Sequence, residues 1–384
     1  MKIVTAIDSF KGSMTSIEAG NAFSDGFHRV FPDARIIVRP LADGGEGTVE
    51  ALTNGMNGHL EHVTVSGPFG QPVDCAYGLI QDSMTAVIEM SGAAGITLVP
   101  AEDLNPLKAT TYGVGEVIAD AIKKGCRHFI IGIGGSATND GGAGMLQALG
   151  FGLLDDDGRE IPRGAEGLEK LAVITTDQVI PELSECTFRI ACDVTNPLCG
   201  SNGCSSVFGP QKGAGPEDIE KMDRCLARYA KVARALHPDA DPEFPGTGAA
   251  GGMGFAFRTF LPAKLESGIQ IVLEETRLES YLKDADLIIT GEGRLDCQTA
   301  MGKVPVGVAR LAKAHGKPVI AFAGSVTDDA SACIECGIDA YFPIVRGVST
   351  LEEACDNENA RKNMAASAEQ AARLIKLTLS FSIK

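Results

Sequence analysis

The chain has 384 residues, of which 44% are hydrophobic, so it is long enough for two domains and a large buried core. Lysine and arginine total 34 against 50 aspartates and glutamates, which gives a formal net charge of -16. This charge repels nucleic-acid phosphates and anionic lipid headgroups, so we expect neither nucleic acid nor a membrane as a partner.

The N-terminal residues predict no targeting or membrane-spanning segment. The apolar run from Ile3 to Ile7 ends at Asp8, far short of a signal-peptide core, and no later run approaches the length of a membrane span. The eleven cysteines lack the spacing of a disulfide framework, and the lone C-x-x-C of Cys333 and Cys336 lacks the second pair of a zinc site. We therefore expect a cytoplasmic protein with reduced thiols and without a protein-only transition-metal site.

Short β-branched runs alternate with longer helical patterns, which predicts parallel strands joined by crossover helices. The predicted strands of this kind are residues 3–7, 35–39, 129–133, 188–191, 287–290 and 319–323. Three other runs follow one another too closely for helices and predict an antiparallel meander: 60–66, 74–79 and 85–90. We therefore expect an α/β fold with a discontinuous first domain, residues 1–62 plus 280–384, and a second α/β domain inserted at 63–279.

Polar residues follow many of these strands. They include the segments beginning at Asp8, Asp43, Glu89, Asp193 and Glu292, with the cations Lys11 and Arg294 close by. Because the carboxyl ends of parallel strands share one edge of a sheet, these loops could converge around a ligand. Each loop alone could be an ordinary helix cap or turn. Capping requires neither cations nor paired acids, however, whereas a magnesium and phosphate site requires both.

The segment from Ile130 to Gly150 runs from an apolar strand into a cluster of glycines and small polar residues. Such an open backbone predicts a loop around an anionic ligand, either phosphate or carboxylate. Residues 208–213 form a rigid turn that either presents Lys212 to a ligand or is simply solvated. The glycine-rich stretch from Thr247 to Gly254 indicates either a binding loop or close helix packing.

A nicotinamide-dependent reductase is the competing interpretation. Residues 132–137 match the G-x-G-x-x-A dinucleotide fingerprint, and Asp155, Asp156 and Asp157 follow at about the right distance for a ribose contact. Against it, residues 138–142 prolong the loop and would place Asp140 near a pyrophosphate. No P-loop and no protein-kinase catalytic-loop signature occurs, so phosphoryl transfer would need another scaffold. A phosphometabolite sensor is a third class, which the surplus of carboxylates disfavours.

Seven segments in order, DSFKGS, LADGGEGT, IGIGGSATNDGGAGM, ACDVTNPL, FGPQKGA, GTGAAGGMG and ITGEGRLDCQT, resemble the bacterial glycerate kinase type 1 family over nearly the whole chain. A local departure is Ile7, where the family often has proline. The resemblance implies ATP-dependent, magnesium-dependent phosphorylation of D-glycerate to 2-phosphoglycerate, in glycerate and glyoxylate or aldarate breakdown. It also implies a flavodoxin-like, Rossmann-like parallel-sheet domain and a restriction-enzyme-like domain, with the site in the cleft between them.

Phosphoryl transfer depends mainly on positioning and charge neutralisation, which suggests roles for these side chains. Asp193 is the preferred group to orient or deprotonate the attacking hydroxyl, with Asp8 as the alternative, and Lys11, Lys212 and Arg294 are candidate clamps. Glycerate contacts are predicted for Ser9, Asp43 and Asn196. Phosphate contacts are predicted for Gly134, Gly135, Ser136, Thr138, Asn139 and Lys212, although the loop from Ser136 to Asn139 could instead bind the glycerate carboxylate.

Magnesium takes only one or two carboxylates beside phosphate oxygens and water. The acids Asp43, Glu46, Glu292 and Asp296 exceed that need, so some of them must bind hydroxyl groups or helix ends. We assign Glu292 and Asp296 to the metal. The sequence leaves the oligomeric state open, a homodimer included.

Overall fold

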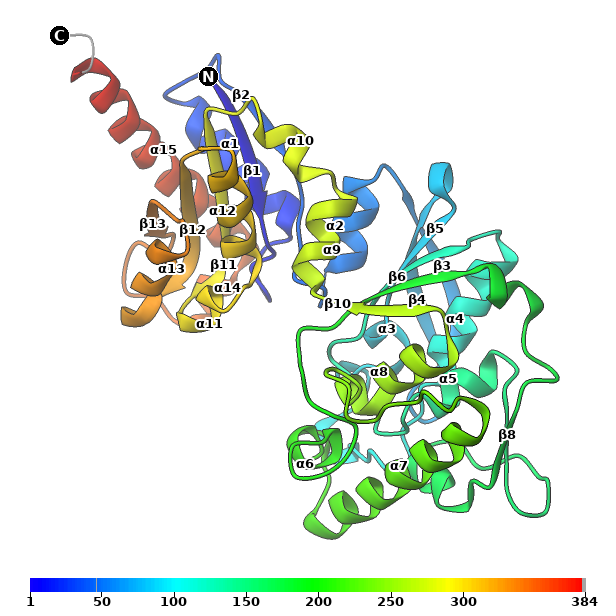
Figure 1. Ribbon diagram of the computed structural model, residues 1–384. Coiled ribbons are helices and arrows are strands. Elements are labelled where there is room, and N and C mark those ends of the chain that lie inside the picture. Colours follow the sequence, from blue (N-terminus) through cyan, green and yellow to red (C-terminus); the bar gives the residue numbers. More distant parts are fainter. Residues whose placement is uncertain (46, 382–384) are drawn as a thin grey trace. The chain divides into compact units, whose positions relative to one another are not determined.

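The computed structural model describes residues 1–45 and 47–381, which form two compact units (Figure 1). Unit 1 contains Met1–Asp43, Asn54–Met56 and the chain from Ile269 onward, and unit 2 contains Gly44–Thr53 and Asn57–Gly268. Both units are therefore discontinuous in sequence. The domain boundaries expected at residues 62/63 and 279/280 remain a prediction.

Unit 1 is built on a parallel sheet whose strands lie in the order β13-β12-β11-β1-β2. Counted along this unit's own chain the order is 2-1-3-4-5, which is the flavodoxin-like arrangement. The apolar runs are short and β-branched, as parallel strands covered on both faces require. The strands are β1 (Lys2–Ile7), β2 (Arg35–Val38), β11 (Leu287–Leu295), β12 (Val319–Val326) and β13 (Ala340–Pro343).

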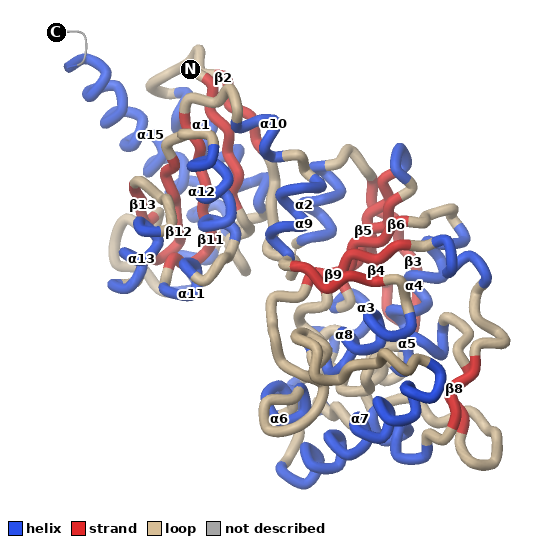
Figure 2. Tube along the Cα trace, viewed as in Figure 1, coloured by secondary structure: helices blue, strands red, loops and turns tan. Residues whose placement is uncertain are grey.

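Helices accompany this sheet (Figure 2). The hydrophobic core of the unit contains four buried phenylalanines, Phe10, Phe23, Phe27 and Phe322. Helix α1 begins at a capping box in which Glu18 N donates to Thr15 Oγ1 and Thr15 N donates to Glu18 Oε2. From it, Phe23 packs edge-on against Phe322 of β12, with ring centroids 5.5 Å apart. The helices are α1 (Ser16–His28), α9 (Gly268–Glu275), α10 (Leu278–Leu282), α11 (Cys297–Ala300), α12 (Val304–Ala314), α13 (Ala332–Glu335), α14 (Leu351–Cys355) and α15 (Asn357–Phe381).

One strand of unit 1 is longer than the sequence indicated. We expected the strand to end at Thr290 and a polar loop to follow, but β11 continues to Leu295. Glu292 pairs with Ala323 and Arg294 with Ser325 of β12, so both residues lie in the sheet. The glycines at 291 and 293 suggested a loop. A Cβ at Gly291 would lie 2.1 Å from the Phe322 carbonyl oxygen, so this glycine permits the close approach of two strands.

Unit 2 contains a mixed sheet in the order β10-β9-β6-β5-β4-β3. Its first four strands are parallel, whereas β3, β4 and β5 form the antiparallel meander that the sequence predicted. A small antiparallel pair, β7 with β8, and the strand β10 were not predicted. The strands are β3 (His59–Ser66), β4 (Pro72–Ile80), β5 (Thr85–Glu89), β6 (His128–Gly132), β7 (Gly152–Leu154), β8 (Val173–Thr175), β9 (Thr187–Ala191) and β10 (Ala263–Glu266).

The helices of unit 2 surround a second core in which Phe129 and Phe188 stack on neighbouring strands, with ring centroids 4.8 Å apart. The mixed α/β fold class that the sequence predicted is confirmed. In the described residues, no helix combines the length and apolarity required to span a bilayer. The helices are α2 (Thr48–Gly55), α3 (Ser91–Ala94), α4 (Tyr112–Lys123), α5 (Ala143–Ala148), α6 (Cys204–Phe208), α7 (Pro216–Leu236) and α8 (Ala249–Phe260).

Helix α8 explains the glycine-rich stretch at 247–254. Its first turn is kinked, with positive φ at Ala250, Gly251 and Gly252. A Cβ at Gly251 would lie 2.1 Å from the Thr138 carbonyl oxygen, so the helix packs directly against the glycine loop after β6. Of the two interpretations of this stretch, the structure supports close packing.

Candidate active site

In unit 1, acidic side chains gather where β1 and β11 end. These neighbours are the first and third strands of the unit, between which the strand order reverses, and ligands of such sheets bind at this point. Asp8 directly follows β1, and its backbone N–H donates to the Gly291 carbonyl oxygen at 2.9 Å. Glu292 lies one residue further along β11, and Asp43 follows β2.

Among these acids, Asp8 has the largest shift in pKa. Its residue is only 3% exposed, and its Oδ1 accepts a hydrogen bond from Ser9 N at 2.7 Å. Burial, and next the negative charge of Asp43, raise the pKa of Asp8 to about 7, with a further contribution from Glu292 and partial opposition from Lys11. This site is therefore short of positive charge.

Lys11 is the cation closest to these acids in sequence. Its Nζ lies 3.5 Å from Asp43 Oδ2, and its side chain remains 55% exposed. An exposed lysine can follow a mobile charged ligand at little cost, because the ammonium stays hydrated. Lys11, Ser9, Asp8 and Asp43 are thus brought together as the sequence suggested. Glu46, the remaining acid of this group, lies outside the described residues.

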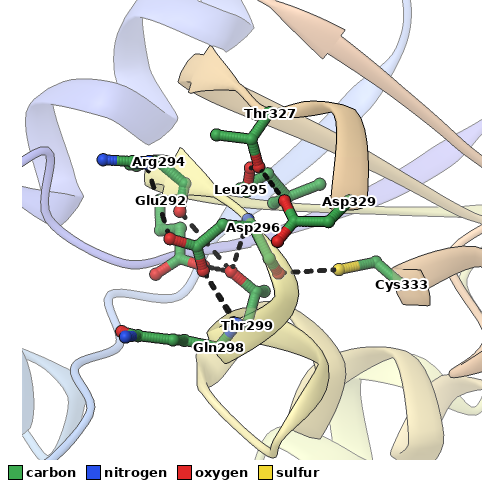
Figure 3. A network of polar contacts seen from close by, with 9 residues as sticks. All are labelled: Glu292, Arg294, Leu295, Asp296, Gln298, Thr299, Thr327, Asp329 and Cys333. Atoms are coloured by element: carbon green, nitrogen blue, oxygen red, sulfur yellow. Dashed lines mark hydrogen bonds and ion pairs between the residues drawn. The ribbon is translucent and has the colours of Figure 1, made fainter. Parts of the chain in front are cut away.

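Glu292 and Asp296 belong to a compact polar network (Figure 3). The Thr299 hydroxyl donates to Glu292 Oε1, and burial raises the pKa of this glutamate. Asp296 Oδ1 accepts from Gln298 N and Thr299 N, which makes Asp296 the N-cap of α11. Its Oδ2 lies 3.5 Å from Arg294 Nε. Capping occupies one oxygen of Asp296 and leaves the other beside an exposed arginine.

The acids of unit 1 fit a magnesium ion that is shared with a ligand. Within residues 1–45 and 47–381, no three His, Cys, Asp or Glu side chains are arranged as a metal cage. Magnesium, however, is usually held by one or two carboxylates together with phosphate oxygens and water. Buried acids that raise one another's pKa are the donor set that such a cation would neutralise.

In unit 2, the glycine loop after β6 is exposed at its start and buried at its end. Gly134 and Gly135 are exposed, whereas residues 136–140 are buried. Ile96 N donates to the Gly135 carbonyl oxygen at 2.8 Å, and Ala137 N donates to the Ala94 carbonyl oxygen at 2.9 Å. Among the described residues, no acceptor is found for the backbone N–H groups of Gly134, Gly135 and Ser136. The exposed end of the loop can therefore donate to an anion.

The side chain of Lys212 contacts the buried part of this loop. The residue is 1% exposed, and its Nζ donates to Ser136 Oγ and to the Thr138 carbonyl oxygen, both at 2.7 Å. Burial lowers the pKa of Lys212 to about 8, and Cys204 and Asp140 partly oppose this shift. The sequence left open whether Lys212 faces a ligand or solvent. In the structure its ammonium faces the loop backbone.

Asp140 is an anchor of the loop, which corrects the place that the sequence suggested for it beside a pyrophosphate. It is fully buried, and its Oδ2 accepts from Thr111 N at 2.8 Å, Thr111 Oγ1 at 2.9 Å and Gly144 N at 3.2 Å. Burial raises its pKa, and these hydrogen bonds oppose that shift. Moreover, α5 begins only at Ala143, so residues 136–139 do not lie at a helix start.

Thr138 and Asn139 are also fully buried. Asn139 Nδ2 donates to Ser205 Oγ at 2.8 Å, which connects the loop to α6. Thr111 and Ser205 had no role in the sequence interpretation, because a polar residue beside a helical pattern is an ordinary feature. Only the fold brings them against the glycine loop. The phosphate contacts predicted for Thr138 and Asn139 remain a prediction.

Asp193 and Asn196 follow β9, the strand next to β6. Asp193 is exposed, and its Oδ1 accepts from Gly268 N at 3.1 Å. Asn196 Nδ2 donates to the Asn202 carbonyl oxygen at 2.8 Å, and its own carbonyl accepts from Gly248 N. Asn196 thus stabilises its own loop, while Asp193 remains an exposed residue.

Comparison with known proteins identifies the family. A profile of the glycerate kinase family matches residues 3–376. The chain belongs to the glycerate kinase family. It is 50% identical to glycerate 2-kinase of Escherichia coli K12 over 355 residues, which cover 92% of this chain and 93% of that one. It is 48% identical to glycerate kinase of Bacillus subtilis 168 over 98% of both chains.

A solved structure agrees with the fold of this glycerate kinase family member. The crystal structure of a protein from Salmonella typhimurium LT2, assigned as a glycerate kinase 2, superposes with a TM-score of 0.91 over 99% of both chains at 48% identity. The chain is accordingly an enzyme of a kinase family, and kinases act on a nucleotide substrate. The dinucleotide fingerprint at 132–137 lacks the helix that should begin within it, because α5 begins only at Ala143, and Asp155 closes a turn by accepting from Asp157 N and Arg159 N.

Proposed function

We propose that this protein transfers the γ-phosphoryl group of ATP to D-glycerate and forms 2-phosphoglycerate, with magnesium as the metal. The observation that carries this proposal is family membership over residues 3–376, together with the Escherichia coli relative named glycerate 2-kinase. Two features of the structure support it. The glycine loop exposes N–H donors suited to an anion, and a group of acids at the end of β1 and β11 suits a magnesium ion.

In this proposal the cations neutralise charge on the transferred group. Lys11 and Arg294 are exposed and can contact phosphate oxygens directly. Glu292 and Asp296 would hold magnesium, which when bound would neutralise phosphate charge. Ser9 and Asp43 are proposed to bind glycerate. These positions suit a reaction that depends mainly on orientation and electrostatics.

Asp193 is the proposed proton acceptor for the attacking hydroxyl. Asp193 is exposed, and Gly268 N donates to its Oδ1, which fixes the direction of a carboxylate that a substrate can reach. Asp8 is the alternative, because its pKa of about 7 is near the value that suits a general base. Asn196 is proposed as a further substrate contact. A role in glycerate or aldarate breakdown and a homodimeric state are further parts of the proposal.

Phosphorus NMR tests the reaction. Purified protein is mixed with ATP, magnesium and D-glycerate, and the phosphorylated product is identified by its chemical shift against authentic standards. We expect ADP and 2-phosphoglycerate. A 3-phosphoglycerate signal would retain the kinase and overturn the position of transfer. Absence of any product from folded protein, with L-glycerate as a control substrate, would contradict the proposed function.

A further inference from the structure

The ammonium of Lys212 is enclosed by protein and directed at the glycine loop of unit 2. The residue ends the short 3-10 turn η6 (Pro210–Lys212), which follows α6. Its two hydrogen bonds join the side-chain oxygen of Ser136 and the main-chain oxygen of Thr138, two residues apart in one loop. Lys212 therefore fixes both the side chain and the backbone of this segment.

Stability alone does not account for a charge at this position. A buried ammonium loses hydration, and an apolar side chain of similar volume can often replace such a group without loss of stability. The depressed pKa of Lys212 reflects the same cost. The nearest acid described, Asp140, is already satisfied by Thr111, Gly142 and Gly144. The benefit of the lysine must therefore lie in what it does to the loop.

The ammonium decides the direction of the Ser136 hydroxyl. An ammonium group only donates, so it occupies an acceptor position of Ser136 Oγ and forces the hydroxyl hydrogen to point elsewhere. Among the described residues, this hydroxyl has no acceptor. A hydroxyl that accepts from a cation is also a stronger donor, because the charge polarises its O–H bond.

The backbone beside Ser136 is oriented in the same sense. The Gly135 carbonyl accepts from Ile96 N, and the N–H and C=O of one peptide point in opposite directions. The N–H of Ser136 therefore points away from residue 96. Gly135 has φ of +73°, which glycine adopts without strain, and it is exposed. In the described part of the chain, Ser136 Oγ–H and the N–H groups of residues 134–136 are thus donors without an acceptor, and the buried hydroxyl of Thr138 is another.

We propose that Lys212 is a positioning residue that holds Ser136 as a hydrogen-bond donor to an anionic oxygen of a substrate. This inference deepens the proposed function and rests on it, since the anion is then either a phosphate of the nucleotide or the carboxylate of glycerate. Lys212 itself acts through Ser136 and the loop backbone. It differs from Lys11, whose side chain is 55% exposed beside Asp43 and can contact a ligand directly.

A double-mutant cycle tests the inference. The variants are Ser136→Ala, Lys212→Met and the double variant, with Lys231→Met on the exposed face of α7 as the matched control. We expect each single variant to lower kcat/KM about 10- to 100-fold, the scale of a hydrogen bond to a charged group. We expect the double variant to lose no more than the larger single loss, because both changes remove the same interaction.

The kinetic constants identify the anion. A raised KM for ATP assigns the loop to a nucleotide phosphate, and a raised KM for glycerate assigns it to the carboxylate, and both results support the inference. A lysine that only supports the fold would instead lower activity independently of Ser136. Losses that multiply in the double variant, or a Ser136→Ala enzyme within twofold of wild type, would overturn it. If Lys212→Met fails to fold, the Ser136→Ala result alone decides.

Hydrogen exchange separates this inference from the proposed function. Amides of residues 134–139 should exchange faster in Lys212→Met than in Lys231→Met, while the rest of unit 2 is unchanged. Unchanged exchange in these amides would count against the positioning role whether or not the enzyme is active. If wild-type protein yields no phosphorylated product while the exchange result holds, the proposed function fails and the loop assignment survives.

Discussion

Asp8 shows how a single carboxyl group couples this protein's stability to pH. Its pKa is raised to about 7 chiefly by burial, so the folded protein binds its proton more tightly than the unfolded chain does. The free energy of unfolding should therefore fall as the pH rises from about 4 to 7 and stay low above that window. The ion-free protein carries this cost, which a bound cation would relieve.

Asp8→Asn should remove that dependence. At pH 8 we expect the variant to be more stable than wild type by at most about 4 kcal/mol, the value of a three-unit pKa shift, and the difference should vanish near pH 4. Thermal or urea unfolding without magnesium measures it. Asp156→Asn, which removes an exposed carboxylate, serves as the control. A wild type more stable than Asp8→Asn at pH 8 would contradict the assigned shift.

Asp193 is the residue whose replacement should affect turnover most selectively. Asparagine retains the acceptor oxygen for Gly268 N but cannot take a proton. We expect Asp193→Asn to lower kcat at least ~100-fold, the usual scale for a positioned acid or base, with an unchanged unfolding midpoint. Steady-state kinetics and a thermal melt measure both. Near-normal turnover would transfer the role of base to Asp8, and Asp8→Asn kinetics would then be decisive.

At the scale of elements, α8 approaches the glycine loop of unit 2 so closely that only glycine fits at the contact. Gly251 has φ of +65° and lies so near Thr138 that an added Cβ would meet its carbonyl oxygen at 2.1 Å. That carbonyl is the one to which Lys212 donates. A substitution at Gly251 should therefore displace the Thr138 carbonyl, and with it the candidate anion loop.

Gly251→Ala should destabilise the protein by about 1–3 kcal/mol through overpacking, in addition to the cost of its backbone conformation. Gly316→Ala is a matched control, because Gly316 has the same φ of +65° and nothing within 4 Å of an added Cβ. Urea unfolding of the two variants separates the clash from the backbone strain. An equal loss of unfolding free energy in both variants would show that the close approach of α8 to the loop adds no cost beyond the backbone strain.

For the whole molecule, the absence of disulfide cross-links has a direct consequence. Across the described residues all eleven cysteines are free thiols, and only Cys297 is exposed. A reductant should therefore leave the unfolding midpoint unchanged. A maleimide should label Cys297 first, although slowly, because its hydrogen bond to Asp329 raises its pKa. A lower midpoint with dithiothreitol, or prior labelling of a buried thiol, would contradict this prediction.

The amino-acid sequence alone was sufficient to predict the fold class, the parallel strands, the antiparallel meander and the family. Each of these depends on local patterns: β-branched runs, turn residues, and motifs that stand in a definite order. The candidate acids Asp8 and Asp43 were also visible, because polar residues that follow parallel strands must share one edge of the sheet. Short strands without a strong apolar run, such as β7, β8 and β10, escaped prediction for the same reason.

Whether a polar residue of the glycine loop is exposed or enclosed by protein depends on the three-dimensional fold. Lys212 and Asn139 were predicted to contact phosphate. The structure shows that both are buried and that they donate hydrogen bonds to Ser136 and Ser205, while their contact with a phosphate stays a prediction. Likewise, the glycines around Glu292 indicated a loop, while pairing with β12 extends the strand. Burial depends on contacts between segments distant in the chain, such as α8 and the residue 138 carbonyl, and no local pattern records them.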